Sequence, residues 1–332
     1  MKNKYIFKTD KIFVAGAYGM VGSAICRFLN NEKYSVINPE NLLTTSRKDL
    51  DFADSTKVNL WFKKNKPDIV ILAAAKVGGI NANKSYPYEF LNENLKIQSN
   101  IIDASKNFGV RRLLFLGSSC IYPKYSLQPI KEEFLLSGHL EVTNQCYAIA
   151  KIAGIKLCEA IRQEYKFDAI SLMPTNLYGP NDNYDLENSH VLPALIRKFY
   201  NAKINNLPNV QCWGSGKPLR EFLHVDDLAE ACIFALCNWN PSDFDAPRDE
   251  KGKNLSWLNI GSNEEISIEK LAKKIADKIN YRGEIIWDTS QPDGTQRKLL
   301  DSSRIFNMGW KPKINLSEGI KRTIKDYVKE NF

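Results

Sequence analysis

The sequence contains no stretch of 18 apolar residues, no C-x-x-C pair and only three histidines among its 332 residues. The missing apolar stretch argues against a transmembrane helix, and residues 1–16 lack the long apolar segment of a signal peptide. Seven cysteines without paired spacing argue against a disulfide framework, and three scattered histidines make no metal site. We therefore expect a reduced, cytoplasmic protein with no metal and no membrane partner.

The formal net charge is +8, carried mostly by lysines spread along the chain. Such a surplus is compatible with a nucleic-acid surface, but aromatic and basic residues do not alternate as they do in such surfaces. We favour solvated lysines together with a pocket for an anionic small molecule, and we expect no nucleic-acid partner.

Apolar runs alternate with helical patterns through the first half of the chain. The runs at 68–75 and 111–119 are continuous, which is typical of strands buried on both faces of a parallel sheet. Strands are expected at 11–16, 41–46, 68–75, 111–119 and 169–179, and helices at 20–30, 56–65, 90–108 and 147–165. This alternation predicts a doubly wound α/β fold.

The composition becomes polar and turn-prone after Pro180. Helices are expected at 191–202, 267–280 and 316–331, with an exposed loop at 248–254. The second half therefore predicts a smaller α/β region placed over the first.

Three glycines, Gly16, Gly19 and Gly22, follow the first predicted strand and open a helix through Met20 and Val21. The spacing is G-x-x-G-x-x-G, not the commoner G-x-G-x-x-G, and by itself it is a weak signal because glycines also simply end strands. Its position in the first strand–helix unit favours a dinucleotide pyrophosphate turn at a helix N-terminus.

The second strand of such a unit ends near the adenosine ribose, where NAD-binding proteins carry Asp or Glu. This chain has hydroxyls and cations at 44–48 instead, including Arg47, and these suit a 2′-phosphate. We therefore predict NADP(H) as the cofactor, with an ordinary basic turn as the alternative. Asp51 follows in the sequence and is a candidate to lie near the adenine of the cofactor.

Tyr147 and Lys151 lie four residues apart at the start of a predicted helix and so share a face. A nearby ammonium lowers the pKa of a tyrosine hydroxyl, which is about 10 when unperturbed. Ser118, at the end of the preceding strand, is placed to hydrogen-bond the carbonyl oxygen of a substrate to which Tyr147 would give its proton. Together these residues predict carbonyl reduction, with hydride from a nicotinamide and a proton from Tyr147.

Longer motifs extend this pattern over nearly the whole chain. They read GAYGMVG, LAAAKVGGI, LGSSCIYP, YAIAKIAG, PTNLYGP, SHVLPALIRK, WGSGKPLREFLHVDD and QPDGTQRKLLD. Their order resembles the extended short-chain dehydrogenase/reductases and, within them, the GDP-L-fucose synthases, which epimerise and reduce GDP-4-keto-6-deoxy-D-mannose. The resemblance implies an NADP-binding Rossmann domain at 1–178 with a returning segment near 220–260. It also implies a mainly GDP-sugar-binding domain at 179–332.

The resemblance also implies a role for a thiol and an imidazole. In that family the cysteine of SSC and the histidine of NSHV are the acid–base pair for epimerisation, here Cys120 and His190. A C4 ketone acidifies the protons at C3 and C5, and both side chains are tunable to proton transfer near neutral pH. Buried cysteines are more often small core residues, and Cys146, beside Tyr147, is a competing candidate.

The substrate-binding residues are implied by the same motifs. They are Asn176, His190, Lys198, Trp213, Arg220 and Lys298. Lys198 stands where relatives carry arginine and lacks its planar fork, so weaker nucleotide binding is expected. Ala17-Tyr18 replaces a His-Arg pair of the glycine turn, so a relaxed preference for NADPH is expected.

Two other functions stay open from the sequence. One is a C4 reductase of another GDP-4-keto-6-deoxy sugar, such as a heptose, with or without epimerisation. The other is a non-catalytic, dinucleotide-responsive regulator on the same fold. By resemblance we also expect a homodimer formed through the helices at 90–108 and 147–165.

Overall fold

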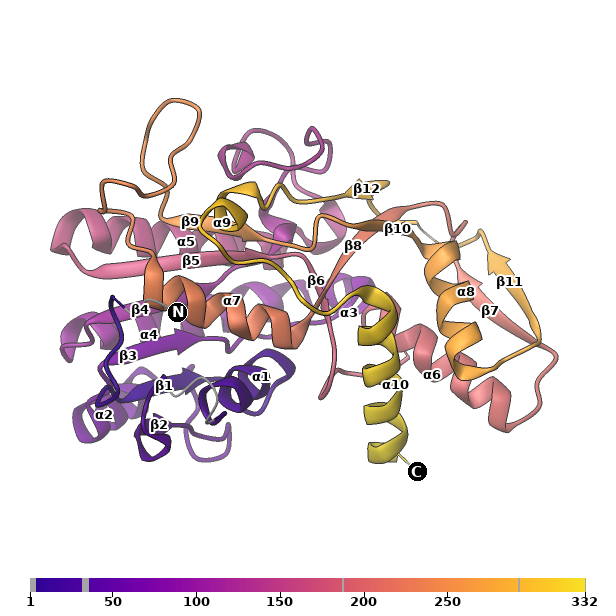
Figure 1. The fold of residues 1–332 in the computed structure, drawn as a ribbon, viewed down its shortest axis with the longest axis horizontal. Coiled ribbons are helices and arrows are strands. Elements are labelled where there is room, and N and C mark those ends of the chain that lie inside the picture. The colour runs from indigo at the N-terminus through magenta and orange to yellow at the C-terminus, as the bar shows by residue number, and fades with distance from the viewer. Residues whose placement is uncertain (1–3, 32–35, 187, 292, 332) are drawn as a thin grey trace.

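A six-stranded parallel sheet in the order β2-β1-β3-β4-β5-β9 forms the centre of the protein (Figure 1). The computed structural model describes residues 4–31, 36–186, 188–291 and 293–331. The strands are β1 (Ile12–Ala15), β2 (Leu42–Leu43), β3 (Ile69–Leu72), β4 (Arg112–Leu116), β5 (Asp168–Pro174) and β9 (Trp257–Ile260). The doubly wound α/β fold predicted from the sequence is confirmed.

The apolar runs form these strands because both faces of the sheet are covered. Every residue of β1, β3 and β4 is buried, and the helices pack as two groups, α1 with α7 and α4 with α2 and α5. Their bounds are α1 (Met20–Leu29), α2 (Ser55–Asn65), α4 (Pro87–Asn107), α5 (Gln145–Tyr165) and α7 (Val225–Asn238).

A second region with its own apolar core lies at one end of the molecule (Figure 1). Strand β8 (Leu219–His224) pairs there with β6 (Asn176–Tyr178), β10 (Glu265–Ser267) and β12 (Arg297–Lys298). Strand β7 (Asn209–Trp213) pairs with β11 (Glu284–Asp288). The helices are α6 (Val191–Ile204), α8 (Ile268–Ile279) and α10 (Leu316–Asn331).

The run at 169–179 forms two strands, not the single strand expected. Pro174 has no N–H to donate and ends β5, and β6 then pairs with β8 outside the central sheet. The strand expected at 41–46 is confined to β2, which pairs only with β1 in the sheet order.

Three helices were not expected: α3 (Ile80–Ser85), α7 and α9 (Ser303–Asn307). Helix α7 is buried almost all round, so its sequence lacks the polar face by which an amphipathic helix is recognised. It packs on α1, and β9 then joins β5, so chain from beyond residue 220 completes the central sheet.

The carboxyl ends of β1, β3 and β4 meet at one edge of the sheet, where ligands bind in open α/β folds. Within the described ranges, no helix is long and apolar enough to cross a membrane. Residues 1–3 of the N-terminal segment, Glu187 of the polar stretch and Pro292 of the last motif lie outside the described residues.

Candidate active site

The turn after β1 requires glycine at two positions. Gly16 has φ +93°, and a Cβ there would lie 2.7 Å from the backbone nitrogen of Ala74. A Cβ on Gly22 would lie 2.0 Å from the carbonyl oxygen of Gly16. Helix α1 begins after Gly19 without a side-chain cap, which leaves its first N–H groups, from Met20 onward, for a ligand. The turn therefore has the shape and the donors that a pyrophosphate needs.

A pocket lies beside this turn, lined among others by Ala17, Tyr18, Leu42 and Thr44. Arg47 lies nearby in sequence, is 85% exposed and forms an ion pair of 3.5 Å with Glu93 of α4. The carboxylate of Asp51 is exposed and accepts a hydrogen bond from the backbone N–H of Ala53 at 2.9 Å. Arg47 can therefore turn toward a ligand, because breaking one exposed ion pair costs little free energy.

Ser118, Tyr147 and Lys151 come together between the end of β4 and the start of α5. Ser118 hydrogen-bonds the side chain of Tyr147. The Lys151 ammonium lies 5.9 Å from the centre of the Tyr147 ring and donates to the carbonyl oxygen of Leu116 at 2.8 Å. The structure therefore brings together the three residues from which the sequence predicts carbonyl reduction.

Burial perturbs two of these groups in opposite directions. It raises the pKa of Tyr147, which nearby Cys120 raises further and the Ser118 hydrogen bond lowers. It lowers the pKa of Lys151 to about 8, because a buried ammonium loses its hydration. A perturbed pair of this kind in one place is typical of a catalytic site.

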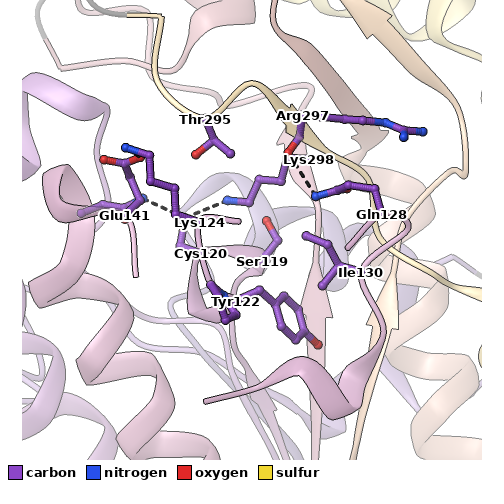
Figure 2. Close-up of a pocket in the computed structure, with 12 residues that line it drawn as sticks. Ser119, Cys120, Tyr122, Lys124, Gln128, Ile130, Glu141, Thr295, Arg297 and Lys298 are labelled. Atoms are coloured by element: carbon purple, nitrogen blue, oxygen red, sulfur yellow. Dashed lines mark hydrogen bonds and ion pairs between the residues drawn. The ribbon is translucent and has the colours of Figure 1, made fainter. Parts of the chain in front are cut away.

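Cys120 lies in the short helical turn after Ser118 with two donors at its sulfur. The side-chain amide of Asn144 lies 3.2 Å from Sγ and the Lys298 ammonium 3.4 Å from it. Figure 2 shows the pocket around this group, with Lys298 reaching Cys120 from β12 and Lys124 beside Glu141. The thiol therefore lies in a polar, cationic pocket and not in the apolar core.

His190 immediately precedes α6 and keeps an exposed face. The surrounding protein lowers its pKa, and the charge of Lys298 lowers it further. Lys298 thus acts electrostatically on His190 while contacting Cys120, which links the two residues expected to form the acid–base pair.

Lys198 and Trp213 form a second cluster at the β7 edge. The Lys198 ammonium lies 5.2 Å from the centre of the Trp213 ring and donates to the carbonyl oxygen of Gln211 at 3.0 Å. Burial lowers the pKa of Lys198, and Trp213 is 46% exposed. An exposed indole beside a cation is suited to a nucleotide base and its phosphate.

Arg220 and Asn176 lie on the paired strands β8 and β6. Burial lowers the pKa of Arg220, while the charges of Cys120 and Asp293 raise it. The Asn176 side chain donates to the carbonyl oxygen of Glu221 at 2.7 Å, next to Arg220. Strand β8 therefore connects the two clusters.

Two site residues escaped the sequence reasoning. Asn144 contacts Cys120, and Asp293 accepts hydrogen bonds from the backbone and hydroxyl of Ser215, close to Trp213. Asp293 belongs to the motif QPDGTQRKLLD, but no spacing rule links Asn144 to a cysteine 24 residues earlier.

The remaining histidines and cysteines agree with structural roles. His224 is buried and accepts a hydrogen bond from the Asp226 N–H, while His139 is exposed. Four cysteines are buried in the core: Cys158, Cys212, Cys232 and Cys237. Among the described residues, no group of three or more His, Cys, Asp or Glu side chains is arranged to hold a metal ion.

A model of the NAD dependent epimerase/dehydratase family matches residues 12–245, most of the chain and the whole glycine turn. The chain belongs to that family. The extended short-chain dehydrogenase/reductase resemblance drawn from the motifs is thereby confirmed.

Several named proteins are similar to the chain over nearly its full length. It is 50% identical over 97% of its length to GDP-L-fucose synthase 1 of Arabidopsis thaliana, of which it covers 94%. It matches a GDP-6-OMe-4-keto-L-xylo-heptose reductase from C. jejuni with a TM-score of 0.89 and 34% identity, covering 99% of this chain and 100% of that one. For a GDP-L-fucose synthetase from Naegleria fowleri bound to NADP the TM-score is 0.85 at 28% identity, covering 99% and 97%.

Proposed function

We propose that this chain converts GDP-4-keto-6-deoxy-D-mannose to GDP-L-fucose by epimerising C3 and C5 and then reducing the C4 ketone with NADPH. The observation that carries the proposal is the position of Cys120, two residues beyond Ser118 and in contact with Lys298. Reduction alone has no use for a thiol there, whereas epimerisation beside a ketone needs a base. The 50% identity to a GDP-L-fucose synthase supports the same substrate.

The reduction uses Ser118, Tyr147 and Lys151. Ser118 and Tyr147 hold the C4 oxygen by hydrogen bonds, and Tyr147 gives that oxygen its proton. Bound NADPH supplies the hydride. The raised pKa of Tyr147 keeps the phenol protonated until charge develops on the oxygen, and Lys151, still mostly protonated at pH 7, stabilises the phenolate that remains.

The epimerisation uses the same oxygen contacts. A base removes the proton next to the ketone, the electron pair moves onto the C4 oxygen, and Ser118 and Tyr147 stabilise this enolate. Proton return on the opposite face inverts the carbon. We assign these two steps to Cys120 and His190.

The cofactor and the nucleotide are bound by different sets of residues. NADP(H) is held by Gly16, Gly19, Met20, Val21, Gly22, Arg47, Asp51, Tyr147 and Lys151, with the glycine turn at its pyrophosphate. The GDP group is bound by a set of residues led by the Lys198–Trp213 pair, together with Asn176, Arg220 and Lys298. Residues 1–178, with the returning segment near 220–260, form the NADP-binding domain, and 179–332 mainly the GDP-sugar domain.

We also propose a cytoplasmic homodimer that binds neither nucleic acid nor membrane. Helices α4 and α5 pack together and carry exposed apolar side chains, including Tyr88 (74%) and Tyr165 (54%), which suit an interface with a second copy.

The test is incubation with NADPH and GDP-4-keto-6-deoxy-D-mannose, followed by NMR identification of the product sugar. GDP-L-fucose is expected, and a GDP-6-deoxy sugar of the D-series would overturn the epimerase half of the proposal. Reactions without NADPH and with the Tyr147→Phe variant are the controls.

A second candidate is the reduction of a GDP-4-keto heptose, favoured by the TM-score of 0.89 to a heptose reductase. Competition between the two ketones at equal concentration decides between them through their kcat/KM ratio. If neither ketone is reduced, the non-catalytic regulator becomes the better explanation.

A further inference from the structure

The sulfur of Cys120 has two hydrogen-bond donors and two different side chains supply them. Asn144 Nδ2 lies 3.2 Å from Sγ, and Lys298 Nζ lies 3.4 Å from it on another element, β12. A neutral thiol is a weak acceptor, whereas a thiolate is a strong one. Two converging donors, one of them charged, therefore fit the anionic form of the sulfur better than the neutral form.

The oxygen of the Asn144 amide, Oδ1, is buried and lacks a hydrogen-bond donor among the residues that the structure describes. Buried polar atoms normally have a partner, so an unpaired acceptor beside a substrate pocket indicates a donor that arrives with the ligand. A sugar hydroxyl is such a donor.

Asn144 is held in place by its own turn. Its N–H donates to the carbonyl oxygen of Glu141 at 3.3 Å, and the Glu141 carboxylate pairs with Lys124 at 3.0 Å. The side chain of Glu141 also accepts a hydrogen bond from the N–H of Thr143 at 3.4 Å. These contacts fix the backbone turn from which the Asn144 amide reaches the sulfur of Cys120.

The charges around the sulfur are mostly positive. The titratable groups that face it or line its pocket are Tyr147 on α5, Arg220 on β8, Arg297 and Lys298 on β12, and the Lys124–Glu141 pair. His190 is coupled to the same site through Lys298.

We propose that Asn144 is a positioning residue which, with Lys298, holds Cys120 as a thiolate base and whose Oδ1 accepts a hydrogen bond from a hydroxyl of the bound sugar. This inference rests on the function proposed above. It gives Asn144 two separable tasks, one for each end of its amide.

The proton balance follows from this arrangement. The thiolate takes the proton from the carbon beside the ketone and becomes a thiol, and the C–H electron pair goes to the enolate oxygen. His190, whose lowered pKa makes its protonated form a minor but more acidic species at neutral pH, returns a proton to the opposite face from that form and becomes neutral. Exposed His190 then regains a proton from water and the thiol releases one, so solvent hydrogen enters the sugar in each cycle.

The first experiment needs no substrate. The pH dependence of iodoacetamide alkylation of Cys120 is measured by peptide mass spectrometry for wild type, Asn144→Asp and Lys298→Met. Loss of either donor is expected to raise the pH midpoint for Cys120 by about one unit. Because the carboxylate of Asn144→Asp raises the midpoint by its charge as well, the uncharged Asn144→Leu is measured beside it and isolates the loss of the donor. Cys146 and Cys26 in the same samples are internal references, and exposed Asn59→Asp and Lys251→Met are the matched control variants.

A second experiment measures deuterium incorporation into the keto-sugar without NADPH. Asn144→Asp keeps an oxygen acceptor and loses the donor, so the pH profile of exchange is expected to shift with the alkylation midpoint while KM stays within about threefold. Asn144→Leu loses both the donor and the acceptor. It is expected to shift the pH profile and also to raise KM about tenfold. If a substitution at position 144 impairs folding, Lys298→Met still tests the donors at the sulfur.

Unchanged alkylation midpoints in both donor variants would overturn the thiolate assignment. A shifted midpoint with an unshifted exchange profile would overturn Cys120 as the base, and equal KM values for Asn144→Asp and Asn144→Leu would overturn the contact with the sugar. Absence of exchange and reduction by wild type would instead overturn the proposed function, whatever the alkylation shows.

Discussion

The Lys151 ammonium donates a hydrogen bond to the carbonyl oxygen of Leu116 at 2.8 Å, which fixes helix α5 to the end of β4. Lys151 comes from the helix that carries Tyr147, and Leu116 ends the strand that leads to Ser118. One buried hydrogen bond thus aligns the two segments that carry the proposed proton donor and its hydroxyl partner. Burial of the Lys151 amine should be visible in how the free energy of unfolding depends on pH.

Lys151→Met is expected to change how stability depends on pH. In the folded chain the pKa of Lys151 is about 8, against 10.5 for a free lysine, so between these values the unfolded chain binds more protons. Stability therefore rises with pH across this window, by about 3 kcal/mol from this group alone. Chemical denaturation of the cofactor-free protein from pH 7 to 11 should show the free energy of unfolding of wild type gaining on that of the variant across this window, because the buried cysteines and tyrosines contribute equally to both curves.

The control for this comparison is Lys64→Met, because Lys64 is exposed on α2. Its curve should parallel that of wild type. Equal slopes for wild type and Lys151→Met would mean that the buried amine does not titrate in this window.

Tyr147→Phe is expected to lower turnover about 100- to 10,000-fold, because it removes only the general acid. NADPH affinity should stay near the wild-type value, since the ring and its packing against Phe90 are retained. Steady-state kinetics and cofactor fluorescence titration measure the two effects. Exposed Tyr125→Phe is the control, and a loss of less than tenfold in Tyr147→Phe would remove Tyr147 from this role.

Arg47→Ala is expected to weaken NADPH binding far more than NADH binding. A charge-assisted phosphate contact is worth about 1.5–3 kcal/mol, which corresponds to roughly a ten- to hundredfold change in affinity. Dissociation constants for both cofactors, in this variant and in exposed Arg282→Ala, provide the measurement. An equal loss for the two cofactors would show that Arg47 does not contact the 2′-phosphate.

Cys120→Ser is expected to separate epimerisation from reduction. A serine hydroxyl fits the same space but is too weak an acid to act as the base, while Ser118, Tyr147 and Lys151 remain intact. In deuterated water without NADPH, exchange at C3 and C5 should fall at least about 100-fold. With NADPH the variant should slowly form a GDP-6-deoxyhexose of the starting D-series, identified by NMR.

Cys146→Ser is the matched control, since Cys146 is the half-buried thiol next to Tyr147. It should exchange and reduce like wild type. Deuterium exchange at the wild-type rate in Cys120→Ser would mean that His190 or Cys146, and not Cys120, is the base.

Features with a local signal could be predicted from the amino-acid sequence alone. The runs at β1, β3 and β4 are apolar because both faces of the strands are buried, and the glycine turn is readable because backbone contacts at Gly16 and Gly22 exclude any Cβ. The pairing of Tyr147 with Lys151 follows from helical spacing. The long motifs added the candidate roles of Cys120 and His190 by resemblance.

Features that depend on contacts between distant segments became visible in the three-dimensional fold. Helix α7 carried no amphipathic signal because it is buried almost all round, and the split of β5 from β6 depends on a second sheet that supplies β8 as partner. The contacts of Cys120 with Asn144 and Lys298 join residues 24 and 178 positions away. Sequence spacing encodes neighbours along one element, whereas the acidity of a side chain is set by whichever groups the fold brings within a few ångströms of it.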